Sequence, residues 1–537
     1  MPSYNRALAA LALFIFVSYV ALAFRPPEQL VERPYQEDSF YMFNAAHHLA
    51  TGHGLSVDGV KPTNGVQPLI VFFYVPFFWL AGADKWLAVK LTFILFALLN
   101  VLSMFLIAGT VRHLARESAP KRTIMRASLI AAGLWAFLMH LVQHNGNGLE
   151  TGLYAALILL GIWYAASRRL FEVEVRPIKG YLLYGAILGL GILARIDGAL
   201  IVAAAALLRL ALPSKDGKRR VVAAFAIGLT ALLVSLPWWL FNYFWFGSVM
   251  PISGQSESMA QLFAYNLFTG PQIIGDILST FFYTPFNQYP AWVSFGWFLL
   301  NVTIVAVIFR RTHLLKRLRA LYSLRPIYPV LIAGILMFIY YVFFFSAPHF
   351  LSRYLHPLRI VWIIIVALGT PLVVVDAKMY LYKSGRIRRA FAIVVVAVVA
   401  VAALVFNVSR YTKAFTLKDF STAYPSGLWA DRHRDGAIGM TSSGIAGFEA
   451  DNVINLDGKV NVDALRARQK HRLVEYIVES GMRYIADDRT MVSTIQRDAL
   501  PLGAHFVIVD SVGSIYMMRR TDSDATTERN NKLWRPL

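Results

Sequence analysis

Eleven strongly apolar stretches constrain the fold of this chain more than any other feature of its sequence. A helix needs roughly 20 predominantly apolar residues, and at least about 17, to cross a hydrocarbon core of about 30 Å. The stretches lie near residues 7–24, 88–110, 127–143, 151–167, 181–194, 198–212, 221–242, 292–309, 328–346, 356–375 and 390–408. The sequence therefore predicts a polytopic α-helical membrane protein with about eleven transmembrane helices.

The composition agrees with a membrane protein and excludes several other classes. Apolar residues make up 57% of the 537 residues and charged residues only 15%, whereas soluble domains are about half apolar and a quarter charged. A chain with this apolar content is not intrinsically disordered. The absence of cysteine excludes disulfides, thiolate metal sites and a cysteine nucleophile.

The net charge of +21 is explained by the loops and does not require nucleic acid as a partner. Lys and Arg concentrate in the loops at 112–126, 168–179, 215–220, 310–325 and 378–389. These basic loops alternate with loops poor in both residues, at 25–87, 144–150, 195–197, 243–291 and 347–355. Because cytoplasmic loops carry an excess of Lys and Arg, we expect the N-terminus and the basic loops inside the cell and the other loops outside.

The apolar segment 66–82 leaves two interpretations open. If it crossed the membrane, every later loop would change sides and all the arginine-rich loops would lie outside. The charge pattern therefore favours a segment that lies in the outer interface. The alternative is a true span, with 181–194 or 198–212 forming a hairpin instead.

The chain divides into a transmembrane domain at 1–408, with its first outer loop at 25–87, a soluble domain at 409–520 and a flexible polar tail at 521–537. By the parity of the spans, the soluble domain lies outside. Short apolar runs at 436–440, 452–456, 484–486, 505–510 and 514–519 predict strands, and the pattern at 466–480 predicts an amphipathic helix. We therefore expect a small extracytoplasmic α/β domain.

Ionisable residues are sparse in the spans and crowd into the outer loops, above all into the first one. Glu37 and Asp38 stand near the start of a short predicted helix that ends before Gly52, and His47 and His48 follow on the same helix. Adjacent carboxylates at a helix N-terminus can act solely through the helix dipole. Their density together with histidines, beside a membrane helix, favours a site for proton transfer.

Several outer segments together resemble a known family. The acidic pair just beyond the first membrane helix is followed by Tyr41, Gly52, Gly54 and the run at 59–69. Further segments lie at 148–151, 194–198, 246–248, 251–255, 353–357 and 455–461. In this order they resemble the GT-C superfamily of polytopic glycosyltransferases, most of all its bacterial and actinobacterial members such as arabinofuranosyltransferases and the protein O-mannosyltransferase group.

The resemblance implies a GT-C fold in a bacterial cytoplasmic membrane and a sugar donor carried on a polyprenyl monophosphate. Nucleotide sugars are not expected outside this membrane, so the donor has to arrive activated on a lipid. Its leaving group is a phosphate monoester with a second pKa of about 6, which departs without an acid catalyst. This chain has Glu37 where many relatives have an Asp, and it lacks the Trp-Trp-Asp motif of oligosaccharyltransferases. Transfer of a whole oligosaccharide to asparagine is therefore not expected.

The predicted reaction needs one base and a positive charge for the phosphate. We assign Asp38 as the general base that takes the proton of the acceptor hydroxyl, with Glu37 as its partner, and which of the two is the base stays open. Direct displacement inverts the anomeric carbon. Arg195 and Arg353 are expected to bind the donor phosphate.

Further outer residues complete the predicted site. The additional candidates for the lipid phosphate are His356 and Lys61. The candidates for sugar or acceptor binding are His47, His48, Asn64, Glu150, Asp197, Ser253, Gln255 and Tyr354. Simpler roles stay open for the arginines, because Arg195 and Asp197 form a typical interfacial salt-bridge pair and Arg353 can extend toward lipid head groups.

No cofactor is expected, because no spacing of His and carboxylates matches a closed coordination set, although Glu37 and Asp38 together could hold a divalent cation. The expected acceptor is a cell-envelope glycan, lipid or protein, in contact with membrane lipids, and the sugar stays open between arabinose, mannose and other hexoses. The main alternative is a transporter or flippase of a lipid-linked sugar. Transporters place charges and broken helices near the bilayer midplane, whereas these charges cluster at the outer ends of the spans.

Overall fold

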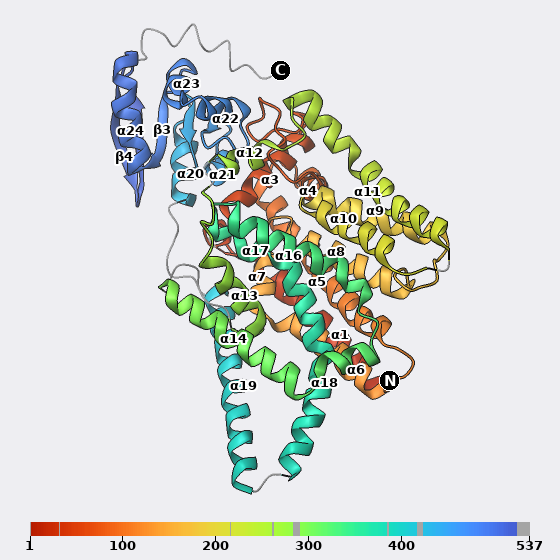
Figure 1. The fold of residues 1–537 in the computed structure, drawn as a ribbon. Helices are drawn as coiled ribbons and strands as arrows, with labels where there is room; N and C mark the ends of the chain where they lie inside the picture. Colours follow the sequence, from red (N-terminus) through yellow and green to blue (C-terminus); the bar gives the residue numbers. More distant parts are fainter. Residues whose placement is uncertain are drawn as a thin grey trace.

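The computed structural model describes residues 2–31, 33–214, 216–259, 262–282, 290–383, 386–415 and 423–522. Most of the predicted flexible tail, at 523–537, lies outside the described residues. A bundle of apolar helices makes up most of the molecule, and a small α/β domain formed by the C-terminal residues covers one end of it (Figure 1).

Seven helices in the described part of the chain are long and apolar enough to cross a membrane. They are α1 (Pro2–Leu22), α5 (Lys85–Leu114), α11 (Gly217–Phe246), α14 (Ala291–Arg311), α16 (Tyr328–Phe343) with its preceding turn η1 (Arg325–Ile327), α18 (His356–Lys383) and α19 (Arg386–Phe415). The other apolar helices are the pair α6 (Lys121–Phe137) and α7 (Met139–Asn145), bent by 63°, and the shorter α8 (Thr151–Ser167), α9 (Ile178–Ala194) and α10 (Gly198–Ala211). Each predicted stretch contains one of these helices or bent pairs, and the chain is an integral membrane protein.

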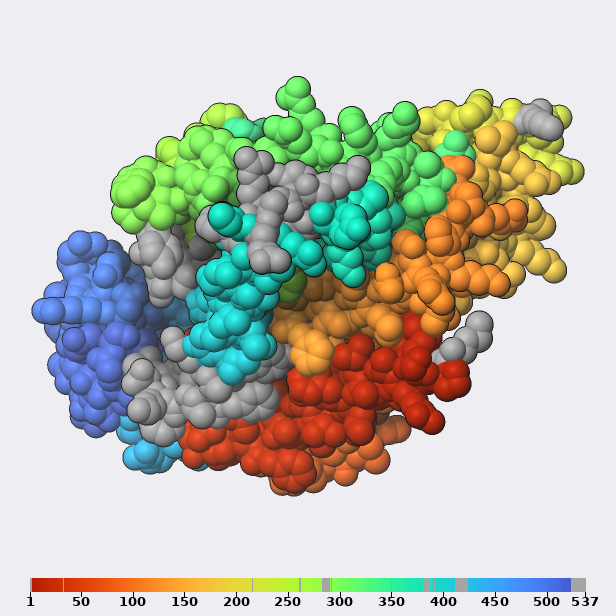
Figure 2. Space-filling view, turned by 90° about the horizontal axis from the view of Figure 1, so that it is seen from below, coloured from red at the N-terminus to blue at the C-terminus, as the bar shows by residue number. Residues whose placement is uncertain are grey.

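The outermost helices present apolar side chains that the described chain does not cover. The apolar window of α19 is 0% buried and that of α14 is 11% buried, whereas that of α5 is 56% buried. Helices that are apolar all round and uncovered suit a lipid environment. Figure 2 shows the N-terminal segment, in red, along one flank of the bundle, and the C-terminal domain, in blue, at one side.

Three of the basic loops meet at one end of the bundle. The backbone nitrogen of Arg116 donates a hydrogen bond to the carbonyl oxygen of Leu321 at 2.8 Å. Glu172 accepts a hydrogen bond from the hydroxyl of Ser323 at 2.9 Å and pairs with Arg325 at 3.5 Å. The loops that follow α5, α8 and α15 (Leu314–Leu321) therefore lie together, as the positive-inside pattern predicts.

The segment at 66–82 forms α4 (Pro68–Ala81), which does not run from one end of the bundle to the other. Its 14 residues span about 21 Å at 1.5 Å per residue. Just before it, Gly65 lies against the backbone of Lys459 in the C-terminal domain. Just after it, Nζ of Lys85 donates to the carbonyl oxygen of Phe448 in the same domain at 2.7 Å. Both ends of α4 therefore lie on the side of the C-terminal domain, as expected for an interfacial segment.

The remaining helices of the outer loops are short. They are α2 (Pro27–Leu30), α3 (Glu37–Ala50), α12 (Ile252–Ser258), α13 (Thr269–Ser279), η2 (Pro348–Phe350) and α17 (Leu351–Tyr354). Of these, α3 and α12 lie where the bundle meets the C-terminal domain, next to α21 and α22 (Figure 1).

The C-terminal domain contains one mixed sheet, which confirms the predicted α/β class. Its elements are α20 (Ala423–Arg432), β1 (Ile438–Met440), α21 (Gly444–Glu449), β2 (Val453–Asn455), α22 (Val462–Gln469), α23 (Leu473–Glu479), β3 (Tyr484–Asp488), α24 (Arg489–Ala499), η3 (Leu500–Leu502), β4 (Phe506–Val512) and β5 (Ile515–Arg520). The strand order is β2-β1-β3-β5-β4, with β1 parallel to β2 and β3, and β5 antiparallel to β3 and β4.

Two local features of this domain differ from the sequence-based expectation. The predicted helix at 466–480 is divided into α22 and α23, because His471 adopts a positive φ of 55° between them. Helix α24 was not predicted. It begins where the side chain of Asp488 caps the helix by accepting hydrogen bonds from the backbone nitrogens of Thr490 and Met491.

Candidate active site

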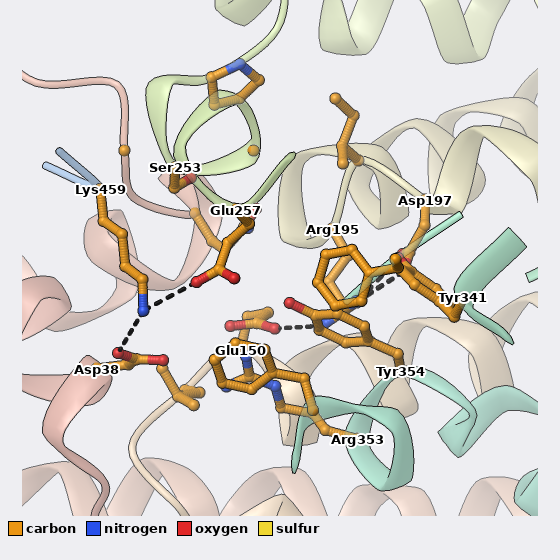
Figure 3. Close-up of a pocket in the computed structure, with 18 of the residues that line it drawn as sticks. Asp38, Glu150, Arg195, Asp197, Ser253, Glu257, Tyr341, Arg353, Tyr354 and Lys459 are labelled. Atoms are coloured by element: carbon orange, nitrogen blue, oxygen red, sulfur yellow. Dashed lines mark hydrogen bonds and ion pairs between the residues drawn. The ribbon is translucent and has the colours of Figure 1, made fainter. Parts of the chain in front are cut away.

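A cavity of about 440 Å³ lies where the bundle meets the C-terminal domain (Figure 3). Its lining residues come from α3, α12, α16, α17, the turn between α9 and α10, and the loop after β2. All five loops that are poor in Lys and Arg contribute to it. The structure thus brings together segments that are up to about 300 residues apart in the bundle, and the C-terminal domain closes one side.

Asp38 enters this cavity from the first turn of α3. The backbone N–H groups at a helix N-terminus favour a carboxylate there. Tyr41 and Met42 also line the cavity, because residues three and four positions apart share one face of a helix. One stripe of α3 therefore faces the cavity, with Asp38 at its start.

A lysine of the C-terminal domain stands opposite Asp38. Nζ of Lys459 lies 2.9 Å from Oε1 of Glu257, 3.8 Å from Oδ2 of Asp457 and 3.9 Å from Oδ1 of Asp38. Burial alone would lower the pKa of Lys459, but Asp38, Asp457 and Glu257 outweigh it and raise this pKa. The ammonium group therefore stays charged among three carboxylates.

Arg195 forms a second charged cluster with two predicted residues on the other side of the cavity. Its Nη1 donates to Oε1 of Glu150 at 2.7 Å and its Nη2 to Oδ2 of Asp197 at 2.6 Å. The hydroxyl of Tyr341 also donates to Oδ2 of Asp197, at 3.1 Å. The guanidinium stacks over the ring of Tyr354 at 4.4 Å. All three charged side chains are at most 8% exposed, so each depends on the others for compensation.

Arg353 is placed differently from Arg195, although both line the cavity. Its guanidinium lies 4.8 Å from the ring centre of Phe350 and 5.3 Å from that of Tyr354. Its Nε and Nη1 are buried and have no hydrogen-bond partner in the described chain. Burial lowers the pKa of Arg353, but Tyr354, Glu150 and Asp38 outweigh this effect and raise it. A charged guanidinium with free donors is suited to an anion.

The structure separates Glu37 from Asp38. Oε1 of Glu37 accepts hydrogen bonds from the backbone nitrogens of Gly444 at 2.6 Å and Ile445 at 3.2 Å, at the start of α21. Burial raises the pKa of Glu37 to about 7, opposed by these two hydrogen bonds and assisted by the charge of Asp38. Glu37 is not among the lining residues, and it connects α3 to the C-terminal domain.

The two histidines of α3 also lie away from the cavity. His47 packs against the ring of Phe78 in α4, with ring centres 5.7 Å apart. Nδ1 of His48 is 3.1 Å from the carbonyl oxygen of Ser56. Burial lowers the pKa of both histidines, which is consistent with neutral rings packed inside the first outer loop.

Three other predicted residues support the walls of the site. Nζ of Lys61 pairs with Asp463 of α22 at 2.5 Å. Oδ1 of Asn64 accepts from the backbone nitrogen of Ile252 at 3.0 Å, which positions the start of α12. The side chain of Gln255 donates to the carbonyl oxygen of Met250 at 2.8 Å. All three side chains therefore bind other groups of the protein.

Ser253, Tyr354 and His356 complete the predicted set. Ser253 and Tyr354 line the cavity. His356 is 1% exposed and lies beyond the lining, with its ring centre 6.2 Å from that of His144. Neither ring nitrogen of His356 has a hydrogen-bond partner in the described chain.

The described residues contain no group of three or more His, Cys, Asp or Glu side chains that could hold a metal ion. Glu37 and Asp38, the pair considered for a divalent cation, direct their carboxylates to different surroundings. Glu37 faces the backbone of α21 and Asp38 faces Lys459. The geometry therefore provides an ammonium, and no shared carboxylate pair, at this position.

Two charged residues of the cavity were not predicted as site residues, Lys459 and Glu257. Lys459 belongs to the segment at 455–461 that contributed to the family resemblance, and Glu257 follows the segment at 251–255 in a loop without Lys or Arg. Their positions gave a weak signal. The sequence contained no signal for the pairing of these two residues, which are about 200 positions apart, because the pairing depends on how the C-terminal domain docks.

The fold is similar to those of ArnT and of an archaeal oligosaccharyltransferase. ArnT from Cupriavidus metallidurans, solved bound to undecaprenyl phosphate, superposes with a TM-score of 0.55 at 12% identity, over 97% of this chain and 98% of ArnT. The oligosaccharyltransferase AglB from Archaeoglobus fulgidus, solved with an inhibitory peptide and a dolichol-phosphate, gives a TM-score of 0.51 at 14% identity, over 97% of this chain and 74% of AglB.

No protein-family model matches the sequence, and no curated protein matches it either. The structural similarity thus extends over nearly the whole chain while the sequences have diverged. The fold agrees with the GT-C expectation, and these comparisons give the transporter alternative no support.

Proposed function

We propose that this chain is an inverting glycosyltransferase that moves one sugar from a polyprenyl monophosphate to a hydroxyl group of a cell-envelope acceptor. The observation that carries the proposal is the cavity itself, which Asp38 and Arg353 both line, together with the two buried guanidinium nitrogens of Arg353 that have no hydrogen-bond partner in the described chain. Among the solved neighbours, ArnT was determined with undecaprenyl phosphate and AglB with a dolichol-phosphate. Both ligands correspond to the lipid phosphate that the proposed donor releases when its sugar is transferred.

Arg353 is the best-suited residue for the donor phosphate. Its Nε and Nη1 have hydrogen-bonding capacity to give, whereas the guanidinium of Arg195 already donates to two carboxylates. Charge-assisted hydrogen bonds to phosphate would satisfy the buried donors of Arg353. They would also stabilise the charge that builds on the phosphate oxygen as the sugar leaves.

Asp38 is the proposed general base. The oxygen of the acceptor hydroxyl attacks the anomeric carbon, the bond from that carbon to the phosphate oxygen breaks, and the hydroxyl proton passes to the carboxylate of Asp38. One displacement of this kind inverts the anomeric configuration. Because Glu37 is engaged by α21, it is proposed as a positioning residue and not as the base.

The walls of the cavity suit the two ends of such a donor. Glu150, Ser253 and Tyr354 offer polar groups for sugar hydroxyls. Leu200 of α10 and Met337 of α16 form part of an apolar wall, which fits the first units of a prenyl chain. A lipid donor thus has polar contacts at its sugar and apolar contacts at its tail.

The proposed location is the bacterial cytoplasmic membrane, with the cavity and the C-terminal domain on its outer side. The segregation of basic loops to the opposite end of the bundle supports this orientation. The acceptor is proposed to be a glycan, lipid or protein of the envelope, and the sugar stays open between arabinose, mannose and another hexose.

The experiment incubates purified full-length protein with a panel of polyprenyl-phosphate pentoses and hexoses and measures released polyprenyl phosphate. Wild type should turn over at least one donor. Asp38→Asn should lower the rate by about 10²- to 10⁴-fold, the usual contribution of a general base. Glu28→Gln, which removes another carboxylate of the first outer loop, serves as the control and should retain activity. A near-normal rate in Asp38→Asn would overturn the assignment of the base.

A further inference from the structure

The loop between β2 and α22 is built to carry one side chain into the cavity. The carbonyl oxygen of Asp457 accepts hydrogen bonds from the hydroxyl of Ser256 and from Nη1 of Arg468, both at 2.6 Å. Gly458 adopts a φ of +80°, and a Cβ there would lie 2.7 Å from Cα of Leu465. The loop is therefore fixed from the bundle side and from its own domain, and the next residue is Lys459.

Lys459 supplies the positive charge nearest to Asp38 among the ion pairs of the described chain. The charged groups that face Asp38 are Lys459 and Asp457 from this loop, Glu257 from α12, Arg353 from α17 and the neighbouring Glu37. Removing Lys459 would leave the three cavity carboxylates repelling one another. An opposite charge within about 4 Å favours an ionised carboxylate and like charges disfavour it.

The position of Lys459 depends on docking of the whole C-terminal domain onto the first outer loop. Besides Glu37 and Lys61, the side chain of Asn44 in α3 donates to the carbonyl oxygen of Gly444 at 3.1 Å. Nε1 of Trp86 donates to Glu449 at 3.0 Å. At Gly65, a Cβ would lie only 1.8 Å from the carbonyl oxygen of Lys459. The domain therefore meets the helix that carries Asp38 along a close and specific surface.

We propose that Lys459 is a positioning residue that orients the carboxylate of Asp38 by charge attraction, so that the C-terminal domain is part of the active site and its docking controls turnover. This inference rests on the proposed function for its meaning in catalysis. Its physical content, the dependence of Asp38 on Lys459, is independent of any donor. A carbohydrate-capturing module on a loose tether would not need such a contact.

The experiment measures the protonation of Asp38 directly in purified full-length protein without donor. A carbodiimide with an amine labels carboxyl groups through their protonated form, and mass spectrometry of the Asp38 peptide gives the pH midpoint of labelling. In Lys459→Met this midpoint should rise, because removing an opposite charge disfavours the ionised carboxylate. Lys459→Arg should keep it near the wild-type value, and Lys470→Met, an exposed lysine of the same domain, should not change it.

An unchanged midpoint in Lys459→Met would overturn the proposal, whatever the activity of the variant. If Asp38→Asn retains full turnover, the proposed function fails instead, and the labelling result still decides the role of Lys459. Where a donor is turned over, the acidic limb of the rate profile in Lys459→Met should move to higher pH by the same amount. A merely structural lysine would lower the rate without moving that limb.

Docking is tested by a substitution that creates a clash with the backbone of the C-terminal domain and removes no charged side chain. Gly65→Ala should push the loop that carries Lys459 away and raise the labelling midpoint as Lys459→Met does. Gly133→Ala is the matched control, because a Cβ at Gly133 meets nothing within 4 Å. A wild-type midpoint and rate in Gly65→Ala would contradict the dependence on docking.

Discussion

The two charged clusters of the cavity differ in where their members come from. Glu150, Arg195 and Asp197 all belong to the bundle, and two of them are separated by a single residue. In the other cluster, Lys459 of the C-terminal domain joins Asp38 of α3 to Glu257 of α12. The first cluster is complete within the membrane domain, whereas the second exists only when the two domains are docked. One wall of the cavity therefore carries a charged cluster that needs only the membrane domain, and the opposite wall carries one that needs the docked C-terminal domain.

The largest expected effect concerns the cluster of Glu150, Arg195 and Asp197, which lies entirely within the membrane domain. Arg195→Met would leave Glu150 and Asp197 buried without their partner, which costs about 3–5 kcal/mol of stability for buried ion pairs. Thermal unfolding in detergent should therefore show a clearly lowered midpoint. Arg434→Met is the control, since its ion pair with Asp431 is 60% and 42% exposed and such pairs contribute little. Equal midpoints for the two variants would contradict the structural role of Arg195.

A smaller effect of a different kind is expected for the other arginine. Arg353→Met removes the Nε and Nη1 donors, which no group of the described chain uses, together with two ring contacts, so its thermal unfolding midpoint should fall far less than that of Arg195→Met. Donor binding should weaken by about 10- to 150-fold, the equivalent of the 1.5–3 kcal/mol of a hydrogen bond to a charged group. Titration of the protein with polyprenyl phosphate measures this change. Unaltered affinity together with reduced stability would make Arg353 a structural residue like Arg195.

The last prediction concerns the connection between the two domains, where the expected effect at any one pH step is small. The pKa of Glu37 is about 7 in the folded protein against an ordinary 4.5. A raised carboxyl pKa contributes stability that is fully present below about pH 4.5 and is lost as the pH rises through about 7. The free energy of unfolding should therefore fall in this window by at most about 1.4 kcal/mol per pH unit.

Glu37→Gln should remove this part of the pH dependence, because an amide does not ionise while its oxygen still accepts the hydrogen bonds of α21. Unfolding curves of wild type and variant, collected between pH 4.5 and 8, make the comparison. The two proteins should converge in slope above about pH 8. Parallel curves throughout would show that the Glu37 carboxyl does not titrate in this range.

The sequence predicted the apolar helices and the loops that build the cavity, because hydropathy and charge act locally along the chain. The bent pair α6 and α7 and the division of the helix at 466–480 depend on single residues that leave the helical conformation, which periodicity does not reveal. The pairing of Arg195 with Asp197 followed from their spacing. The ammonium of Lys459 did not, because its place depends on domain docking.

Helix geometry explains why the predicted acidic pair separated. Adjacent residues on a helix point about 100° apart, so Glu37 and Asp38 cannot both face one cavity. Counting from Asp38, the positions at 41 and 42 fall on its face, whereas His47 falls on the opposite side. This argument needs the helix boundaries but no tertiary structure. It would have assigned Tyr41 and Met42 to the site in place of His47.

The late position of Lys459 in the chain affects when the protein can become complete during synthesis. All the membrane helices precede it, and ribosomes produce the chain from its N-terminus. A product released by a premature stop codon after α19 would insert every apolar helix and still lack one wall of its cavity. The part of the chain that is synthesised last thus supplies the ammonium group that faces Asp38.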